Sequence, residues 1–357
     1  MSELIEIDGS FGEGGGQILR TSLSLSCLLK RPFRIFNIRK GRKKPGLMPQ
    51  HLACVKAMEL LSSAKVEGAS TGSMELTFEP GEVKPGEFFF DIGTAGSTML
   101  VIQTMLPCLA LSGEKSSITI KGGTHVPFSP SFHYVREVFC EFLKILGIKV
   151  SLTIEQFGFY PKGGGLIRAE IEPARNIKTI KLIERGRLLK IRGLSCVANL
   201  PLSIAERQKE GFIRTISNAL PSKPDIDIEI LSVKSPGPGT FIHITAQFEN
   251  SIAGFTALGE KGKKAEKVGE EAGTSFLRYY ETGRALDPNL ADQIILYLGL
   301  AGGVSEFTTS EITRHLLTNL WVLNRFTGLE YEISDEEGKE GIVKIKGRLT
   351  ETSPFII

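Results

Sequence analysis

An internal repeat limits the folds open to this chain more than any other feature of its sequence. Ile38-Arg-Lys-Gly41 is followed by a proline and then by His51, and Ile120-Lys-Gly-Gly123 is followed by a proline and then by His133. Self-similarity at a fixed offset, here about 80 residues, indicates a pseudo-symmetric fold in which equivalent loops gather on one side of the molecule. We therefore looked for one unit of secondary structure that recurs along the chain.

The periodicity of apolar residues predicts the order β-α-β-α-β-β for each copy of the unit. The first copy has predicted strands at 4–8, 33–38, 65–68 and 73–78, and helices at 17–29 and 50–61. The second has predicted strands at 88–91, 117–121, 148–154 and 166–171, and helices at 99–111 and 132–146. The third, interrupted copy has predicted helices at 290–301 and 313–326 and strands at 306–310, 331–334 and 342–346. Hairpins and crossovers alternate in each copy, which predicts an α/β fold with mixed sheets.

The segment between the second and third copies follows a different pattern. It is predicted to run β-α-β-β-α, with strands at 188–197, 225–231 and 240–248 and helices at 201–220 and 262–280. It has no loop that combines glycine with a basic cluster. We predict three βαβαββ repeats that form a large domain, residues 1–183 and 280–357, and a small inserted βαββα domain, residues 184–279.

Composition excludes several classes of protein. No apolar run reaches the roughly 18 residues of a membrane span, and the amino terminus lacks the basic region and apolar core of a signal peptide. Five scattered cysteines without a C-x-x-C pair predict reduced, buried thiols in a cytoplasmic protein and argue against a zinc site. The net charge is only +3, so any nucleic-acid binding must rest on local basic clusters.

The segment Asp8 to Arg20, DGSFGEGGGQILR, is a candidate anion site. Three glycines follow Glu13 and lead from a predicted strand into a predicted helix. Such a turn points backbone N–H groups and a helix amino terminus at an anion. No Gly-Lys-Ser/Thr follows, so the segment is not a Walker loop. The alternative, a tight strand-to-helix turn without a ligand, stays open at this point.

His51 and His315 each fall in the first turn of a predicted helix and close to other polar residues. The positive end of a helix disfavours imidazolium, so His315 is predicted to stay neutral and nucleophilic near pH 7. A neutral imidazole can attack phosphorus without a separate base. The alternative is a histidine that caps its own helix and packs beside Asn319. His243 alternates with apolar residues and is predicted to be structural, whereas His125 and His133 are weaker ligand candidates.

A cluster of five basic residues in six, Arg39 to Lys44, precedes Pro45-Gly46 and then Gln50-His51. Arginine can hold a phosphate through two parallel hydrogen bonds and lysine as a point charge, so the loop is a candidate phosphate site. The alternative is a solvated surface loop, the usual meaning of a charge run. Asp292-Gln293 lie in the first turn of an apolar helix, where an acid also complements the helix dipole.

Several segments, in order along the chain, resemble the RNA 3'-terminal phosphate cyclases. They are EGGGQILR (13–20), RKGRKKPGLMPQH (39–51), GTAGST (93–98) with Gln103, GFYPKGGG (158–165), LADQ (290–293) and RHLLTN (314–319). The resemblance extends from Ile5 to about Phe326. It implies an ATP-dependent ligase that needs a divalent metal (Mg or Mn) and converts an RNA 3'-phosphate to a 2',3'-cyclic phosphate. It also implies three βαβαββ units and an insert of thioredoxin-like topology.

The resemblance implies a role for each matching residue. His315 would attack the α-phosphate of ATP, release pyrophosphate and hold AMP; the RNA 3'-phosphate would then take the AMP, and the 2'-hydroxyl would displace it. Glu13 would place the metal and the phosphates, with Gln17 facing the same site. The residues expected to grip the RNA terminal phosphate are Arg20, Arg39, Arg42, Gln50 and His51. The residues expected to line the nucleotide pocket are Gln103, Asn289, Leu290, Ala291, Asp292 and Gln293, with Pro130 against adenine.

One position departs from the family pattern. Some relatives place an aromatic residue at the head of the LADQ segment, where this chain has Asn289. The resemblance therefore does not imply that residue 289 stacks on adenine. Discrimination between bases would rest on other contacts. The expected partner is RNA with a 3'-phosphate end; no membrane partner is expected, and a homodimer is a candidate assembly.

Two other classes of function compete with this interpretation. One is a non-catalytic cyclase-like protein in ribosomal RNA maturation, which is expected to lack the nucleophilic histidine, whereas His315 stands within an intact HLLTN segment. The other is an enolpyruvyl transferase, a related repeat architecture with arginine-rich phosphate sites. Neither alternative requires a nucleotide bound covalently to histidine.

Overall fold

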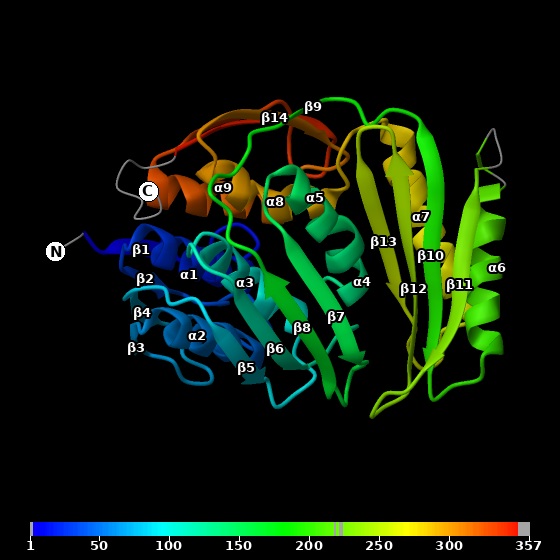
Figure 1. Cartoon of the computed structure of the whole chain (residues 1–357), viewed down its shortest axis with the longest axis horizontal. Helices are drawn as coiled ribbons and strands as arrows, with labels where there is room; N and C mark the ends of the chain where they lie inside the picture. The colour runs from blue at the N-terminus through cyan, green and yellow to red at the C-terminus, as the bar shows by residue number, and fades with distance from the viewer. Residues whose placement is uncertain (1–2, 218, 221–223, 349–357) are drawn as a thin grey trace.

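The chain folds into four four-stranded sheets with helices packed against them (Figure 1). This computed structural model describes residues 3–217, 219–220 and 224–348. The predicted α/β class with mixed sheets is confirmed. Within the described residues, no helix is both long enough and apolar enough to cross a membrane. The ends of the predicted domains at 1–2 and 349–357 lie outside the described residues.

The first sheet is built from the amino-terminal 80 or so residues in the predicted order β-α-β-α-β-β. Its elements are β1 Ile5–Asp8, α1 Gln17–Leu29, β2 Phe33–Phe36, α2 Pro49–Ser62, β3 Lys65–Glu67 and β4 Leu76–Glu79. The spatial order of the strands is β1-β2-β4-β3. Strands β1 and β2 are parallel, and the other two pairings are antiparallel.

The second and third sheets have the same strand order and pairing as the first. The second contains β5 Glu87–Asp91, α3 Thr98–Ala110, β6 Ser116–Gly122, a continuous helical segment of α4 Phe132–Tyr134, η1 Val135–Phe139 and α5 Cys140–Ile145, then β7 Val150–Gln156 and β8 Gly165–Ile171. The third contains β9 Lys181–Leu182, α8 Pro288–Leu300, β14 Gly303–Thr309, α9 Arg314–Thr327, β15 Glu330–Ile333 and β16 Gly341–Gly347. In each sheet the first two strands are parallel and the last two are antiparallel neighbours.

The fourth sheet lies between β9 and α8 in the sequence and corrects the predicted βαββα pattern. Its elements are β10 Leu188–Ala198, α6 Ser203–Ser217, β11 Ile226–Val233, β12 Gly239–Phe248, β13 Ile252–Leu258 and α7 Ala265–Thr282, so the order is βαβββα. The prediction missed β13 because alanine and glycine interrupt its apolar pattern. A Cβ on Gly254 would lie 2.6 Å from the Val138 side chain and 2.8 Å from the Tyr134 ring. Gly254 is therefore required because the strand packs closely against α4 and η1 at this position.

Helix α1 lies at the centre of the largest core, packed against α2, α3 and α9. The hydroxyls of its buried serines donate hydrogen bonds to backbone carbonyls. Ser22 Oγ donates to the Ile18 carbonyl, and Ser24 Oγ donates to the Thr104 carbonyl of α3. These small polar residues let neighbouring helices approach α1 on several sides. A second core lies between the fourth sheet and helices α6 and α7. The two cores meet at β13, α4 and η1.

Three buried histidines lie where the two cores meet. His125 Nε2 and His133 Nδ1 are 2.8 Å apart, and His243 Nδ1 is 2.7 Å from Thr256 Oγ1. Burial lowers the pKa of His125 and His133 well below the ordinary value, and lowers the pKa of His243 to about 4. Arg136 lowers all three pKa values, whereas Glu137 raises that of His243. The prediction that His243 is structural agrees with this location.

These histidines make the fold sensitive to acid. Their pKa values in the folded protein lie below the ordinary value of 6.5, so protons bind the unfolded chain first. Their contribution to stability is present above pH 6.5 and is lost as the pH falls toward 4. The substitution His243→Gln keeps hydrogen-bonding groups and removes one titration. We expect the pH dependence of the unfolding free energy in this range to fall by up to about 1.4 kcal/mol per pH unit. An unchanged slope in denaturant titrations would contradict this assignment.

Candidate active site

A cleft of about 850 Å³ opens beside the first turn of α9. Loops from the first and third sheets form its walls. They contribute Ser10, Gly12, Glu13 and Gly14 after β1, Lys40, Gly41 and Arg42 after β2, Glu311, Thr313, Arg314 and His315 around the start of α9, and Glu337 and Gly338 between β15 and β16. The glycine turn, the basic loop and His315 therefore meet in one cavity.

The glycine turn is held against α9. The backbone N–H of Glu13 donates to Thr318 Oγ1 at 3.0 Å, and the Phe11 ring stacks on Trp321 with centroids 4.2 Å apart. Gly12 has φ +59°, and a Cβ there would lie 2.2 Å from Thr318 Oγ1. Glycine is required at this position both by the backbone conformation and by the close approach of α9.

Glu13 connects this turn to the basic loop. Its Oε1 accepts from the Gln17 backbone N–H at 2.9 Å, at the amino terminus of α1. Its Oε2 accepts from Arg42 Nη2 at 2.8 Å, and the same nitrogen donates to the Glu13 carbonyl at 2.7 Å. The Glu13 side chain is only 7% exposed, whereas that of Arg42 is 48% exposed. Arg42 thus neutralises a buried carboxylate on one side and faces the cleft on the other.

His315 lies in the first turn of α9, as predicted. Thr313 caps the helix, its Oγ1 accepting from the Leu316 N–H at 3.0 Å. The imidazole is exposed to the cleft, yet the cleft walls remove part of its hydration and lower its pKa. Glu13 opposes this effect, while Arg20 and Arg42 lower the pKa further. A pKa below the ordinary 6.5 leaves the ring neutral near pH 7, and lost hydration is the largest of these causes.

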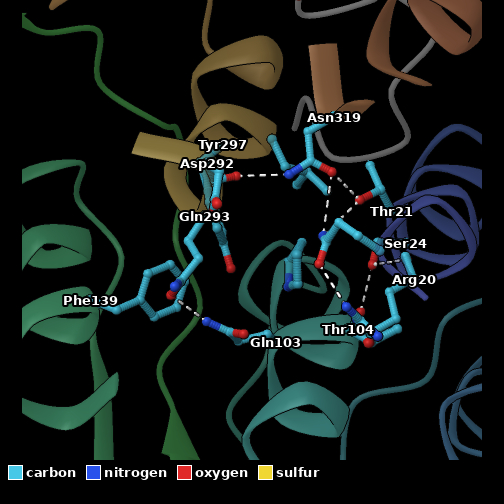
Figure 2. A pocket seen from close by; sticks show the side chains of 13 residues that line it. Arg20, Thr21, Ser24, Gln103, Thr104, Phe139, Asp292, Gln293, Tyr297 and Asn319 are labelled. Carbon is cyan, nitrogen blue, oxygen red and sulfur yellow. Dashed lines mark hydrogen bonds between the residues drawn. The ribbon is translucent and has the colours of Figure 1, made fainter. Parts of the chain in front are cut away.

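A second, small cavity of about 40 Å³ lies deeper, among α1, α3, α8 and α9 (Figure 2). Asn319 of α9 joins the helices around it. Its Oδ1 accepts from Thr21 Oγ1 at 2.7 Å and from Gln17 Nε2 at 3.3 Å, and its Nδ2 donates to the Asp292 carbonyl at 2.8 Å. On the far wall, Gln103 Nε2 donates to Gln293 Oε1 at 2.6 Å. The predicted nucleotide residues of α3 and α8 thus face the predicted residues of α1.

The electrostatics of this cavity are unusual. The packed walls around Asp292 raise the pKa of its carboxyl well above the ordinary value, and Asp287 raises it further. Thr313 and Arg20 oppose the shift. Burial also raises the pKa of Asp287, the cap of α8, to about 6. Arg20, which donates to Gln17 Oε1 at 2.8 Å, is the cation that Asp292 faces.

The start of α1 also brings Arg20 and His51 together. A Cβ on Gly16 would lie 2.6 Å from His51 Nε2 and 2.7 Å from Arg20 Nη1. His51 Nδ1 accepts from the Met48 N–H at 3.1 Å, which leaves Nε2 directed at the glycine turn. Burial, with Arg20 and Arg39, lowers the pKa of His51 to about 3. His51 is therefore a neutral hydrogen-bonding group beside a cation.

The other predicted residues fall in different surroundings. Arg39 donates to the carbonyls of Lys44 and Gly46, so it also shapes its own loop. Gln50 lies next to the turn at Gly96. The four remaining positions line neither cavity: Leu290 and Ala291 are buried in the core, Asn289 is exposed and Pro130 is half-buried.

Three residues that connect the helices of the site by hydrogen bonds were not among the predicted site residues: Thr21, Thr318 and Asn319. Asn319 follows His315 by four residues in RHLLTN, which places both on one face of a helix. That spacing was visible in the sequence. Its contact with Thr21, 298 residues away, was not.

The residues of the cleft could bind a metal ion that substrate phosphates and water also bind. They could not surround such an ion by themselves. Within the described residues, no group of three or more His, Cys, Asp or Glu side chains is placed to hold a metal. Glu13 is the one carboxylate beside both the glycine turn and His315 in the cleft lining. Mg²⁺ commonly binds through one or two carboxylates together with substrate phosphates and water. Glu13 fits that role.

Comparisons with known proteins agree on one family. The model of the RNA 3'-terminal phosphate cyclase family matches residues 11–333. RNA 3'-terminal phosphate cyclases of Thermococcus kodakarensis and Staphylothermus marinus are each 44% identical, over 96% and 97% of this chain and 98% of each relative. That of Sulfurisphaera tokodaii is 46% identical over 94% of this chain and 97% of the relative.

Among solved structures, the enolpyruvyl transferase NikO from Streptomyces tendae aligns with 99% of this chain and 50% of its own at a TM-score of 0.42. The two sequences are 10% identical. This similarity is too low to support a conclusion about fold or function.

Substitution of Gly12 tests the fit between the glycine turn and α9. Gly12→Ala would place a methyl group against Thr318 and strain a left-handed backbone. We expect it to lower the unfolding free energy by about 1–3 kcal/mol in denaturant titrations. Gly41→Ala is the matched control, since nothing lies within 4 Å of a Cβ there. Its effect should stay within about 0.5 kcal/mol. Equal effects of the two substitutions would contradict the proposed close packing.

Proposed function

The chain belongs to the RNA 3'-terminal phosphate cyclase family, and we propose that it performs the family's reaction with His315 as the covalent nucleophile. The activity is the ATP-dependent conversion of an RNA 3'-terminal phosphate to a 2',3'-cyclic phosphate. The observation that carries the assignment to His315 is its neutral, accessible imidazole in the cleft that Glu13 and Arg42 also line. Transfer of a nucleotidyl group depends on geometry and on stabilised charge more than on acid–base catalysis.

In the first step, an imidazole nitrogen of His315 would attack the α-phosphate of ATP, and pyrophosphate would leave. The attacking nitrogen needs no proton removed because the ring is already neutral. We propose that backbone N–H groups of the glycine turn and the guanidinium of Arg42 would stabilise charge on the phosphate oxygens. A divalent metal bound at Glu13 would supply further charge neutralisation there.

In the second and third steps, the RNA 3'-phosphate would take AMP from His315, and the neighbouring 2'-hydroxyl would then attack the activated phosphate and release AMP. We propose that Arg20, Arg39, Arg42, Gln50 and His51 hold the terminal phosphate. The proximity of Arg20 and His51 to Gly16 supports this set. His51, with its pKa lowered to about 3, can donate or accept a hydrogen bond without carrying a charge.

We propose that the nucleotide contacts the walls between α3 and α8. The hydrogen-bonded pair of Gln103 and Gln293, with Asp292 beside them, supports this location. The raised pKa of the Asp292 carboxyl favours its neutral form more than in an exposed aspartate, and the group lies in the wall of this cavity. Gln17 would reach the same nucleotide. Pro130 and the Asn289-to-Ala291 segment stay proposed contacts by resemblance.

We propose that the first three sheets are βαβαββ repeats of one large catalytic domain, and that residues 184–279 form an inserted domain of thioredoxin-like topology. The strand order β11-β10-β12-β13, with its first pair parallel, supports that topology. A cytoplasmic location is supported by five buried cysteines without a disulfide. The homodimer stays a prediction.

Self-labelling tests the role of His315. We expect the protein to retain acid-labile label from α-labelled ATP in the presence of Mg²⁺ or Mn²⁺. His315→Ala should reduce that label at least about a thousandfold, because no other group replaces a covalent nucleophile. His243→Gln serves as the control histidine and should label like the wild type. A well-folded wild type that never takes up label with either metal would exclude the covalent mechanism.

The two arginines of the basic loop should separate the steps. Arg39→Ala removes a candidate phosphate ligand but leaves Glu13 paired. We expect self-labelling to be largely intact and kcat/KM for transfer to RNA to fall by about 10- to 100-fold. Arg42→Ala also unpairs Glu13, so both steps should decline. If Arg39→Ala reduced labelling as much as transfer, its assignment to the RNA phosphate would be wrong.

A further inference from the structure

An exposed aromatic and basic turn joins β7 to β8 and has no part in the steps described above. The Tyr160 side chain is 67% exposed, and Lys162 is exposed beside it. The preceding residue, Phe159, is only 4% exposed and packs with Phe241 of β12 in a small separate cluster. The turn therefore has one buried aromatic residue and presents the next one to solvent.

The backbone of this turn is held in place on both sides. The Gly163 N–H donates to the Phe159 carbonyl at 2.7 Å. A Cβ on Gly163 would lie 2.7 Å from the Ala95 Cα, and one on Gly164 would lie 3.0 Å from the Pro236 ring. The glycines thus allow the turn to pack between the β5–α3 loop and the β11–β12 loop. Tyr160 is presented on a backbone that its neighbours restrain.

Lys162 places a positive charge next to this ring. Its aliphatic stem packs over Gly237, where a Cβ would lie 3.2 Å from the Lys162 Cβ. Among the residues that the structure describes, no carboxylate lies within ion-pair distance of its ammonium group. Aromatic side chains beside basic groups are the features with which proteins bind single-stranded nucleic acid without sequence preference.

One short segment connects the turn with a proposed phosphate-binding residue. The Ala95–Gly96 segment that packs on Gly163 also reaches the start of α2, where a Cβ on Gly96 would lie 3.6 Å from the Gln50 Cβ. Gln50 precedes His51 in the proposed phosphate site. In Figure 1 the β7–β8 and β11–β12 turns lie at the same, lower edge of the molecule. A surface made by adjacent loops therefore leads from the terminal-phosphate site to Tyr160.

We propose that Tyr160 and Lys162 bind the single-stranded RNA that precedes the 3'-terminal nucleotide. Tyr160 stacks on a base, and Lys162 contacts a backbone phosphate. The proposal rests on the proposed function in one respect, the position of the RNA end near Gln50. A chain whose end is held there must pass across a neighbouring surface, and the loop at Ala95 and Gly96 adjoins both Gln50 and the turn that carries Tyr160. Stacking tolerates any base because every base has an aromatic face.

Binding of labelled, 3'-phosphorylated oligonucleotides tests this site. Fluorescence anisotropy would compare RNAs of about 3 and about 12 nucleotides on the full-length protein. We expect Tyr160→Ala to weaken binding of the longer RNA by about tenfold or more, since stacking losses of this size are typical. Tyr160→Phe keeps the ring and should bind like the wild type. Lys162→Ala should weaken binding and reduce the slope of log K against log salt by about 1.

The short RNA separates this site from the catalytic cleft. Its affinity should be the same for the wild type and for Tyr160→Ala. Unchanged affinity of Tyr160→Ala for the longer RNA, or an equal loss for both lengths, would overturn the proposal. Anisotropy does not depend on turnover. A wild type that binds the longer RNA through Tyr160 but forms no cyclic phosphate would therefore overturn the proposed function and leave this binding site in place.

Discussion

The hydrogen bond from the Glu13 backbone N–H to Thr318 Oγ1 is the contact on which the site depends. It joins residues 305 positions apart and brings the glycine turn of the first sheet onto the helix of the third. Gly12 permits this approach because it has no Cβ. The Glu13 carboxylate accepts a hydrogen bond from Arg42, which holds the basic loop beside the glycine turn. Together with the bonds from Gln17 and Thr21 to Asn319, this contact sets the glycine turn beside His315 in one cleft.

Three histidines occupy corresponding positions in the elements of the first three sheets. His51, His133 and His315 each lie in the first turn of the second helical segment of their unit. Each has a lowered pKa, and burial is the largest cause in every case. Their surroundings differ. His51 faces Arg20 at the glycine turn, His133 is enclosed beside His125, and His315 opens into the cleft. Of the three rings, only that of His315 lines the large cleft.

Local signals were read correctly where each element carries its own periodicity, as in α1, α9 and the strands of the first sheet. They failed at β13, where Gly254 is required by close packing against α4 and η1 and Ala253 is buried in the second core. In the candidate site, too, local sequence signals succeeded and contacts between distant segments were missed. Turn and basic-loop residues were identified from their composition, whereas the bridging role of Asn319 depends on Thr21 and Asp292, which lie far away in the sequence.

The order of elements, the family, and the residue types able to bind phosphate follow from the sequence, because backbone periodicity and short motifs are local properties. The tertiary structure decided which of the candidate groups share a cavity and which are enclosed. It placed Leu290 and Ala291 in the core, brought Arg42 to Glu13, and opened only one of the three equivalent helix starts to the cleft. Burial and charge proximity set the pKa values, and both depend on neighbours supplied by distant segments of the chain.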